Sequence, residues 1–120
     1  MRDLPVAGRL VFINCLIFAV MAATSGSLWH LPGARLIGWG ANFGPLTLGG
    51  EPWRLVTSLF VHGGLPHVGL NMLALWQVGH LVEMLFGRGR FLVLYLGAGL
   101  VASIASVWWR PAVNSVGASG

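Results

Sequence analysis

Three long apolar stretches dominate the chain and predict three membrane-spanning helices. They cover about residues 10–25, 67–86 and 91–109. A helix of roughly 20 apolar residues crosses the core of a bilayer, so each stretch, with its flanking residues, is long enough to span it. The first stretch is apolar throughout except for Asn14, and the third contains small residues that let neighbouring helices approach closely. The pattern therefore indicates an all-α, polytopic membrane protein.

The segment between the first two spans, about residues 26–65, has a different character. Glycines and prolines interrupt it repeatedly, and Trp29 and Trp39 are residues of the kind that settle at membrane interfaces. Residues 53–61 are apolar again and predict a short helix. Uncovered backbone is tolerated at membrane depth only against protein or water. We therefore expect a loop that lies partly in the interface and docks on the neighbouring spans.

The composition supports this class and argues against others. Of 120 residues, 56% are hydrophobic and 8% are charged, whereas a soluble domain carries about 25% charged residues. The net charge of +4 comes from seven arginines that stand singly or in small groups. Nucleic-acid binding needs a clustered basic face, so we expect no nucleic-acid partner. The lone Cys15 allows no intrachain disulfide and completes no metal-ligand spacing.

The arginines give a weak indication of orientation. They divide between the two sides of the predicted spans, with Arg2, Arg9, Arg88 and Arg90 on one side and Arg35, Arg54 and Arg110 on the other. The positive-inside rule therefore favours, by a narrow margin, a cytoplasmic N-terminus. The short leader before the first span favours a bacterial inner membrane.

Polar residues near the second span are the first candidate site. His67 and Asn71 are four residues apart, which places them on one face of a helix. Both side chains can donate hydrogen bonds, and two donors aimed at one point can stabilise an oxyanion. The alternative is that each residue makes a polar contact between spans, and the pair alone favours that alternative.

The second candidate is the closing segment Gly117-Ala118-Ser119-Gly120. A serine among small residues at the beginning of a helix can project its hydroxyl as a nucleophile. The free N–H groups of a helix N-terminus favour a developing negative charge. Small residues are also common where membrane helices cross, so this motif alone is better explained by packing.

Together these residues resemble the rhomboid family of intramembrane serine proteases, over nearly the whole chain. The motifs that carry the resemblance, in order, are Trp53-Arg54, His62, His67 with Asn71, Glu83 with Gly87, and Gly117 to Gly120. The resemblance implies a partial rhomboid domain over residues 1–120, with three complete spans, a membrane-embedded loop and the start of a fourth span at about residues 116–120.

The resemblance also implies a function and a role for each matched residue. Rhomboids cleave peptide bonds in or near transmembrane segments of membrane proteins with a Ser–His dyad, and they need no metal or cofactor. Ser119 matches the nucleophile, and His67 and Asn71 match the oxyanion-stabilising side chains. The supporting or structural positions are matched by Trp53, Arg54, His62, Glu83, Gly87 and Gly117.

The general base is the one departure from the family pattern. In the family it is a histidine on a later span, and neither His30 nor His80 matches it. A serine needs an adjacent base to be activated, so we expect an incomplete chain that is inactive alone. A terminal carboxylate beside Ser119 near the membrane is costly, which favours the same expectation. The alternative is a non-catalytic rhomboid-like protein that binds transmembrane clients, although the intact His67, Asn71 and Ser119 favour the protease.

Overall fold

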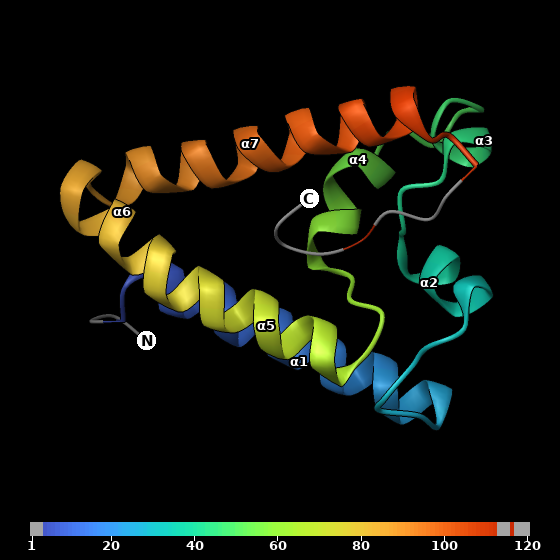
Figure 1. Cartoon of the computed structure of the whole chain (residues 1–120), viewed down its shortest axis with the longest axis horizontal. Helices are drawn as coiled ribbons and strands as arrows, with labels where there is room; N and C mark the ends of the chain where they lie inside the picture. Colours follow the sequence, from blue (N-terminus) through green and yellow to red (C-terminus); the bar gives the residue numbers. More distant parts are fainter. Residues whose placement is uncertain (1–3, 113–115, 117–120) are drawn as a thin grey trace.

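Three long helices form the frame of the computed structural model, which describes residues 4–112 and 116 (Figure 1). Each has the length and hydropathy of a membrane span. They are α1 (Val6–Ser25), a continuous helix from Leu65 to Phe86, and α7 (Arg88–Trp109). The prediction of an all-α, polytopic membrane protein with three spans is therefore confirmed over the described residues.

The second span is not uniform along its length. It consists of α5 (Leu65–Ala74), a π-helical turn η2 (Leu75–Gly79) and α6 (His80–Phe86). Gly79 lies in the wider turn, where an added Cβ would press against the ring of Phe91 on α7. A glycine here lets α7 approach the wide turn closely.

A reversal at Gly87 joins the second and third spans. Gly87 has φ of 91°, a conformation that favours glycine, and its N–H bonds to the carbonyl of Glu83. The next helix begins at once, and Phe91 N–H donates to the Gly87 carbonyl over 3.0 Å. The hydrophobic pattern predicts a third span from about Phe91, whereas Arg88 to Arg90 form the first turn of α7, because the chain reverses at Gly87.

Short helices fill the connection between α1 and α5. They are α2 (Gly33–Trp39), α3 (Gly44–Thr47), α4 (Arg54–Thr57) and the 3₁₀ turn η1 (Ser58–Phe60). From the turn at Gly87, α5–α6 and α7 diverge, and α4 lies between their open ends with α2 and α3 beyond it (Figure 1). The helix α1 packs along α5 and α6.

Two apolar clusters hold these elements together. The larger joins α1, the connecting segment and α5, and consists of Phe18, Met21, Ala22, Leu31, Leu36, Ala41, Val61, Val68 and Met72. The smaller joins α1 to α7 near the Gly87 turn, and consists of Ala7, Leu10 and Phe91. Many large apolar side chains, such as Val93 and Trp108, face outward from the helices, as expected where lipid is the solvent.

Candidate active site

Backbone hydrogen bonds between two non-helical segments set the position of His67 at the start of α5. The N–H of Leu31 donates to the Gly63 carbonyl over 2.8 Å, and the N–H of Leu65 donates to the Leu28 carbonyl over 2.7 Å. The backbones are so close that a Cβ on Gly64 would collide with the Trp29 carbonyl. Glycine at this position therefore allows the loop after α1 to hold the first turn of α5.

The imidazole of His67 is held by a hydrogen bond from the backbone. The N–H of Gly63 donates to Nδ1 of His67 over 3.2 Å. Because Nδ1 accepts, the neutral ring carries its proton on Nε2. His67 can thus present an Nε2–H donor, which is one of the two donors that an oxyanion hole requires.

Asn71 lies one helical turn further along α5. Its Nδ2 donates to the backbone carbonyl of His67 over 2.8 Å, so the amide lies on the His67 face of the helix. An asparagine amide has two N–H donors, and this bond uses one of them. Asn71 also borders a cavity of about 320 Å³ between α5–α6 and α7. Its second donor can therefore serve a group bound beside the helix.

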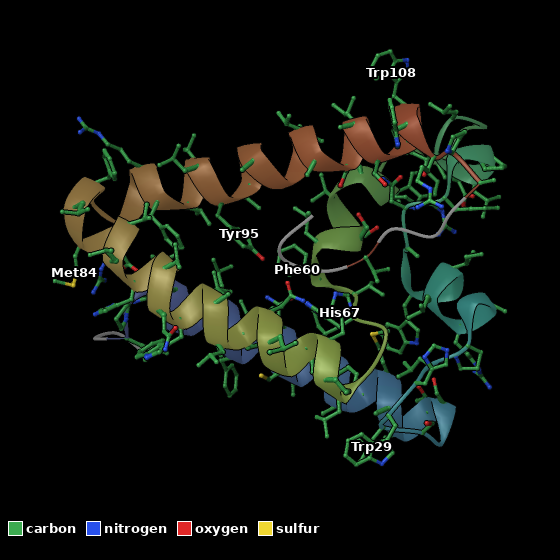
Figure 2. All side chains as sticks on the ribbon, in the orientation of Figure 1. Trp29, Phe60, His67, Met84, Tyr95 and Trp108 are labelled. Carbon is green, nitrogen blue, oxygen red and sulfur yellow. The ribbon has the colours of Figure 1, made fainter. Side chains whose placement is uncertain are left out.

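His62 packs against His67 from the connecting segment. The two ring centroids are 5.2 Å apart in an edge-to-face arrangement, and His62 is fully buried. Burial, and to a lesser extent the neighbouring His67, lower the pKa of His62 to about 4, although a hydrogen bond with the backbone of Phe60 opposes the shift. His62 is therefore neutral at neutral pH, and its uncharged ring lies behind His67. Its two neighbours, His67 and Phe60, are labelled in Figure 2.

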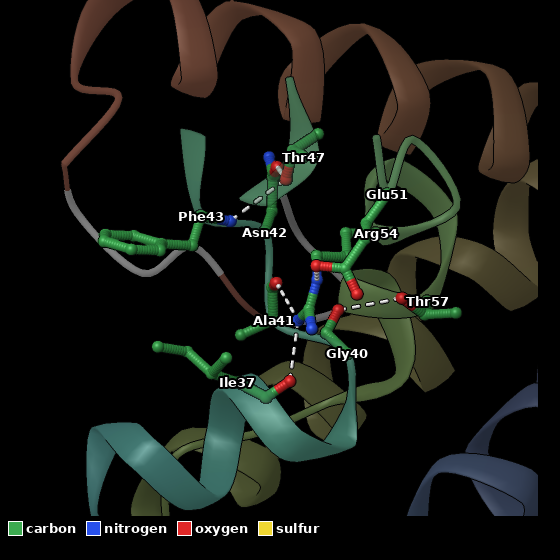
Figure 3. Close-up of polar contacts among 9 residues, drawn as sticks. All are labelled: Ile37, Gly40, Ala41, Asn42, Phe43, Thr47, Glu51, Arg54 and Thr57. Carbon is green, nitrogen blue, oxygen red and sulfur yellow. Dashed lines mark hydrogen bonds and ion pairs between the residues drawn. The ribbon is translucent and has the colours of Figure 1, made fainter. Parts of the chain in front are cut away.

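Arg54 holds the connecting segment from within. Its Nη1 donates to the carbonyls of Ile37 and Ala41, over 2.6 and 3.0 Å, and its Nε lies 3.5 Å from the Glu51 carboxylate (Figure 3). These carbonyls belong to the C-terminal end of α2 and the residues that follow, where a cation is favoured. Its neighbour Trp53 is 55% exposed.

A second polar cluster ties the same segment to α7, and the sequence analysis missed it. The Asn42 amide donates to the Ser103 carbonyl over 2.9 Å, and the Thr47 hydroxyl donates to Asn42 Oδ1 over 2.9 Å. Thr47 also accepts from the N–H of Phe43 over 3.2 Å (Figure 3). The available signal was a pair of polar residues, Asn42 and Thr47, in an otherwise apolar, glycine-rich segment.

Glu83 performs a structural task at the other end of the second span. Its two carboxylate oxygens accept hydrogen bonds from the N–H groups of Val6 and Ala7, over 2.7 and 2.9 Å. Arg88 lies 3.8 Å from the same carboxylate. The residue before α1 is Pro5, whose side chain cannot accept a hydrogen bond. Glu83 therefore caps α1 from a distant helix.

The structure brings together only part of the predicted site. His62, His67 and Asn71 lie close to one another, whereas Ser119 and Gly117 lie outside the described residues. His30 is exposed and borders a cavity of about 290 Å³ with His67. His80 lies on α6 and stacks on Trp76, with ring centroids 5.4 Å apart. Within the described ranges, no group of three or more His, Cys, Asp or Glu residues could hold a metal ion.

Comparison with known proteins finds similarity to named rhomboid proteases. The chain is 41% identical over 110 residues to the rhomboid protease GluP of Bacillus subtilis, covering 92% of this chain and 21% of that protein. It is 31% identical over 119 residues to the putative rhomboid protease YdcA of the same organism, covering 93% and 58%. It is 34% identical over 77 residues to the rhomboid protease AarA of Providencia stuartii, covering 64% and 27%.

These relatives are longer than the chain, which spans between about a fifth and three fifths of their lengths. No solved structure matches the chain significantly. The sequence model of the rhomboid domain family matches residues 49–120. This range includes α4 to α7 and the positions of His62, His67, Asn71 and Ser119. The chain therefore belongs to the rhomboid family.

Proposed function

We propose that this rhomboid chain is part of an intramembrane serine endopeptidase that cleaves transmembrane or juxtamembrane peptide bonds of membrane proteins. The observation that carries the proposal is the pairing of His67 and Asn71 on one face of a membrane span. The Gly63 bond leaves Nε2–H of His67 as a donor, and Asn71 has a second amide donor on the same face. The similarity to named rhomboid proteases supports it.

In the proposed reaction, the Ser119 oxygen attacks the scissile carbonyl carbon. The serine proton passes to a general base while the carbonyl oxygen becomes an oxyanion. His67 Nε2–H and the Asn71 amide donate to this oxyanion, and the backbone N–H of Ser119 adds a third donor. The base then protonates the leaving amine as the C–N bond breaks, and water hydrolyses the acyl-enzyme.

The general base in this proposal is a histidine beyond these 120 residues. The four histidines of the chain are His30, His62, His67 and His80. In the proposal His67 donates to the oxyanion, and His62 packs against the His67 ring. His80 stacks on Trp76. We therefore propose that the 120 residues alone are inactive, with residues 116–120 beginning the span that carries Ser119.

The remaining matched residues support this site in the proposal. Arg54, with Trp53 beside it, holds the connecting segment, and Glu83 with Gly87 fixes how α1, α6 and α7 meet. Gly117 provides a small residue two positions before the nucleophile. His62 keeps the space behind His67 uncharged.

The proposed setting is a bacterial inner membrane with a cytoplasmic N-terminus. The arginine distribution favours this orientation, and the relatives include bacterial rhomboid proteases. The substrates are membrane proteins presented from the surrounding bilayer. In this orientation the connecting segment and His67 lie toward the outer side.

A non-catalytic rhomboid-like protein that binds transmembrane clients is the second candidate. The observation that favours it is the Asn71 amide, which already bonds to its own helix. Labelling of the full-length protein with a fluorophosphonate probe separates the two candidates. The protease incorporates the probe and the Ser119→Ala variant does not, whereas equal labelling of the two proteins would exclude Ser119 as the nucleophile.

A further inference from the structure

The turn η1 lies along α7, and each of its three residues contacts a different turn of that helix. The pairs are Ser58 with Ser103, Leu59 with Gly99, and Phe60 with Tyr95. The two buried serine hydroxyl oxygens are 3.5 Å apart, and the two aromatic rings meet edge to face with centroids 6.5 Å apart. The three residues of α7 are spaced four apart, so they share one face of the helix.

The closest of these contacts is between Leu59 and Gly99. A Cβ on Gly99 would lie 2.6 and 2.7 Å from the two terminal methyl groups of Leu59. Leu59 is only 2% exposed, so these methyl groups are enclosed by protein. The glycine therefore sets how near η1 approaches α7.

The residues after η1 connect this contact to the ring of His67. His62 is fully buried, bonds with the backbone of Phe60 and packs against the His67 ring. The next residue, Gly63, donates its N–H to Nδ1 of His67 over 3.2 Å. Tyr95, Phe60 and His67 lie in this order between α7 and α5 in Figure 2. The position of η1 on α7 thus controls the backbone that holds the His67 ring.

We propose that Gly99 and Leu59 are positioning residues that set the orientation and the proton position of the His67 ring. Only three residues separate Leu59 from Gly63. A displacement of η1 therefore moves the N–H that Gly63 donates to His67. Without this bond, nothing on the Nδ1 side keeps the proton on Nε2. A misplacement of about 1 Å can lower an enzyme's rate about a hundredfold. The inference rests on the proposed function for the role of His67 as an oxyanion donor.

Gly99→Ala is the variant that tests this inference, and Gly97→Ala is its matched control on the same helix. Both changes add one methyl group and gain the same helix propensity. Gly97 shares a face with the exposed Val93 and Val101. A Cβ on Gly97 would meet no neighbouring element within 4 Å in the part of the chain that the structure describes. Leu59→Val is the compensating change, because valine does not reach the position of the leucine's terminal methyl groups.

The proton position on His67 is the direct measurement. Full-length protein with ¹⁵N-labelled histidine is placed in lipid nanodiscs, and the His67 signals are identified by their loss in His67→Gln. NMR then distinguishes a ring nitrogen that accepts from one that carries a proton. The parent and Gly97→Ala should show the proton on Nε2, and Gly99→Ala should shift the His67 signals toward a mixture of the two forms. Gly99→Ala combined with Leu59→Val should restore the parent signals.

Two NMR results would overturn the inference. One is a set of unchanged His67 signals in Gly99→Ala. The other is a change that persists when Leu59→Val is added, because the effect would then not pass through Leu59.

Cleavage of a single-span reporter in proteoliposomes gives the functional measurement. Gly99→Ala should lower kcat about tenfold or more with little change in KM, and Gly97→Ala should stay within about twofold of the parent. An unchanged kcat in Gly99→Ala would overturn the inference. If the parent itself does not cleave the reporter, the proposed function fails, whereas the NMR measurement still decides whether Gly99 positions His67.

Ser103→Ala is the second variant, for the case in which Gly99→Ala does not fold. It removes the hydroxyl opposite Ser58 and keeps the Ser103 carbonyl that accepts from Asn42. The His67 signals should shift in the same direction as predicted for Gly99→Ala, with Tm within a few degrees of the parent. Unchanged His67 signals in folded Ser103→Ala would then overturn the inference.

Discussion

The N–H of Gly63 donates to Nδ1 of His67 over 3.2 Å, and this contact decides which nitrogen of the ring carries the proton. The loop that supplies the N–H is held in turn by two backbone hydrogen bonds between residues 28–31 and residues 63–65. The donor on His67 thus depends on a close approach of two backbones, far apart in the sequence. Gly63 donates the N–H to His67, whereas Gly64 allows the two backbones to approach closely. Substitution of each glycine distinguishes these roles.

Gly64→Ala should destabilise the full-length protein, and Gly63→Ala should not. A Cβ on Gly64 would collide with the Trp29 carbonyl, whereas a Cβ on Gly63 would make ordinary contacts of 3.8 and 3.9 Å. Overpacking of this kind costs about 1–3 kcal/mol. Thermal unfolding of the two variants in the same detergent measures the difference. Equal stability of the two variants would show that the segments are not paired as described.

The stability of the protein should depend on pH through His62. Its pKa is lowered to about 4 in the folded protein, while an unfolded histidine titrates near 6.5. The unfolded state therefore binds more protons between these values, and stability falls as the pH drops from about 6.5 toward 4. The free energy of unfolding falls by up to about 3 kcal/mol over this pH range.

A His62→Asn variant should lose most of this pH dependence. His30→Asn is the matched control, because His30 is exposed in the connecting segment. Unfolding by denaturant at a series of pH values gives the comparison. If the free energy of unfolding still fell with pH in His62→Asn and no longer did so in His30→Asn, the effect would not come from His62.

Glu83→Ala should destabilise the chain far more than Glu51→Gln. Glu83 is buried and accepts two backbone hydrogen bonds at the start of α1, so its removal leaves two N–H groups unsatisfied. The expected loss is on the order of 3 kcal/mol. Glu51 makes a partly exposed ion pair with Arg54, which contributes less than about 1 kcal/mol.

Hydrogen exchange at the start of α1 provides the local readout for Glu83. The amides of Val6 and Ala7 should exchange faster in Glu83→Ala and remain protected in Glu51→Gln. Unchanged protection of both amides in Glu83→Ala would contradict the capping contact.

The sequence pattern predicts the membrane-spanning helices of this protein better than the long-range hydrogen bonds that hold them together. Length and hydropathy predict the three spans, since few other structures accommodate such apolar stretches. The capping of α1 by Glu83 joins residues 76 and 77 positions apart, and the Asn42–Ser103 bond joins residues 61 apart. Helical periodicity reports neighbours at three and four residues only, so contacts of this kind need the packed structure.

In the candidate site, too, the sequence predicts which residues share a helix face but not the contacts from distant segments. The spacing of His67 and Asn71 predicts that they share a face, because both lie on one helix. It does not predict the proton position on His67, which depends on the backbone of Gly63. The role of Ser119 stays a prediction from the family resemblance, since that residue lies outside the described part of the chain.

The turnover of Asn71→Ala tests the oxyanion role most directly. The assay follows cleavage of a single-span reporter by the full-length protein in proteoliposomes. Gln77→Ala is the control, because Gln77 is an exposed residue on the same span. Loss of one oxyanion donor should lower kcat about a hundredfold or more with little change in KM. Gln77→Ala should remain within about twofold of the parent. Cleavage by Asn71→Ala at the parent rate would contradict the proposed site.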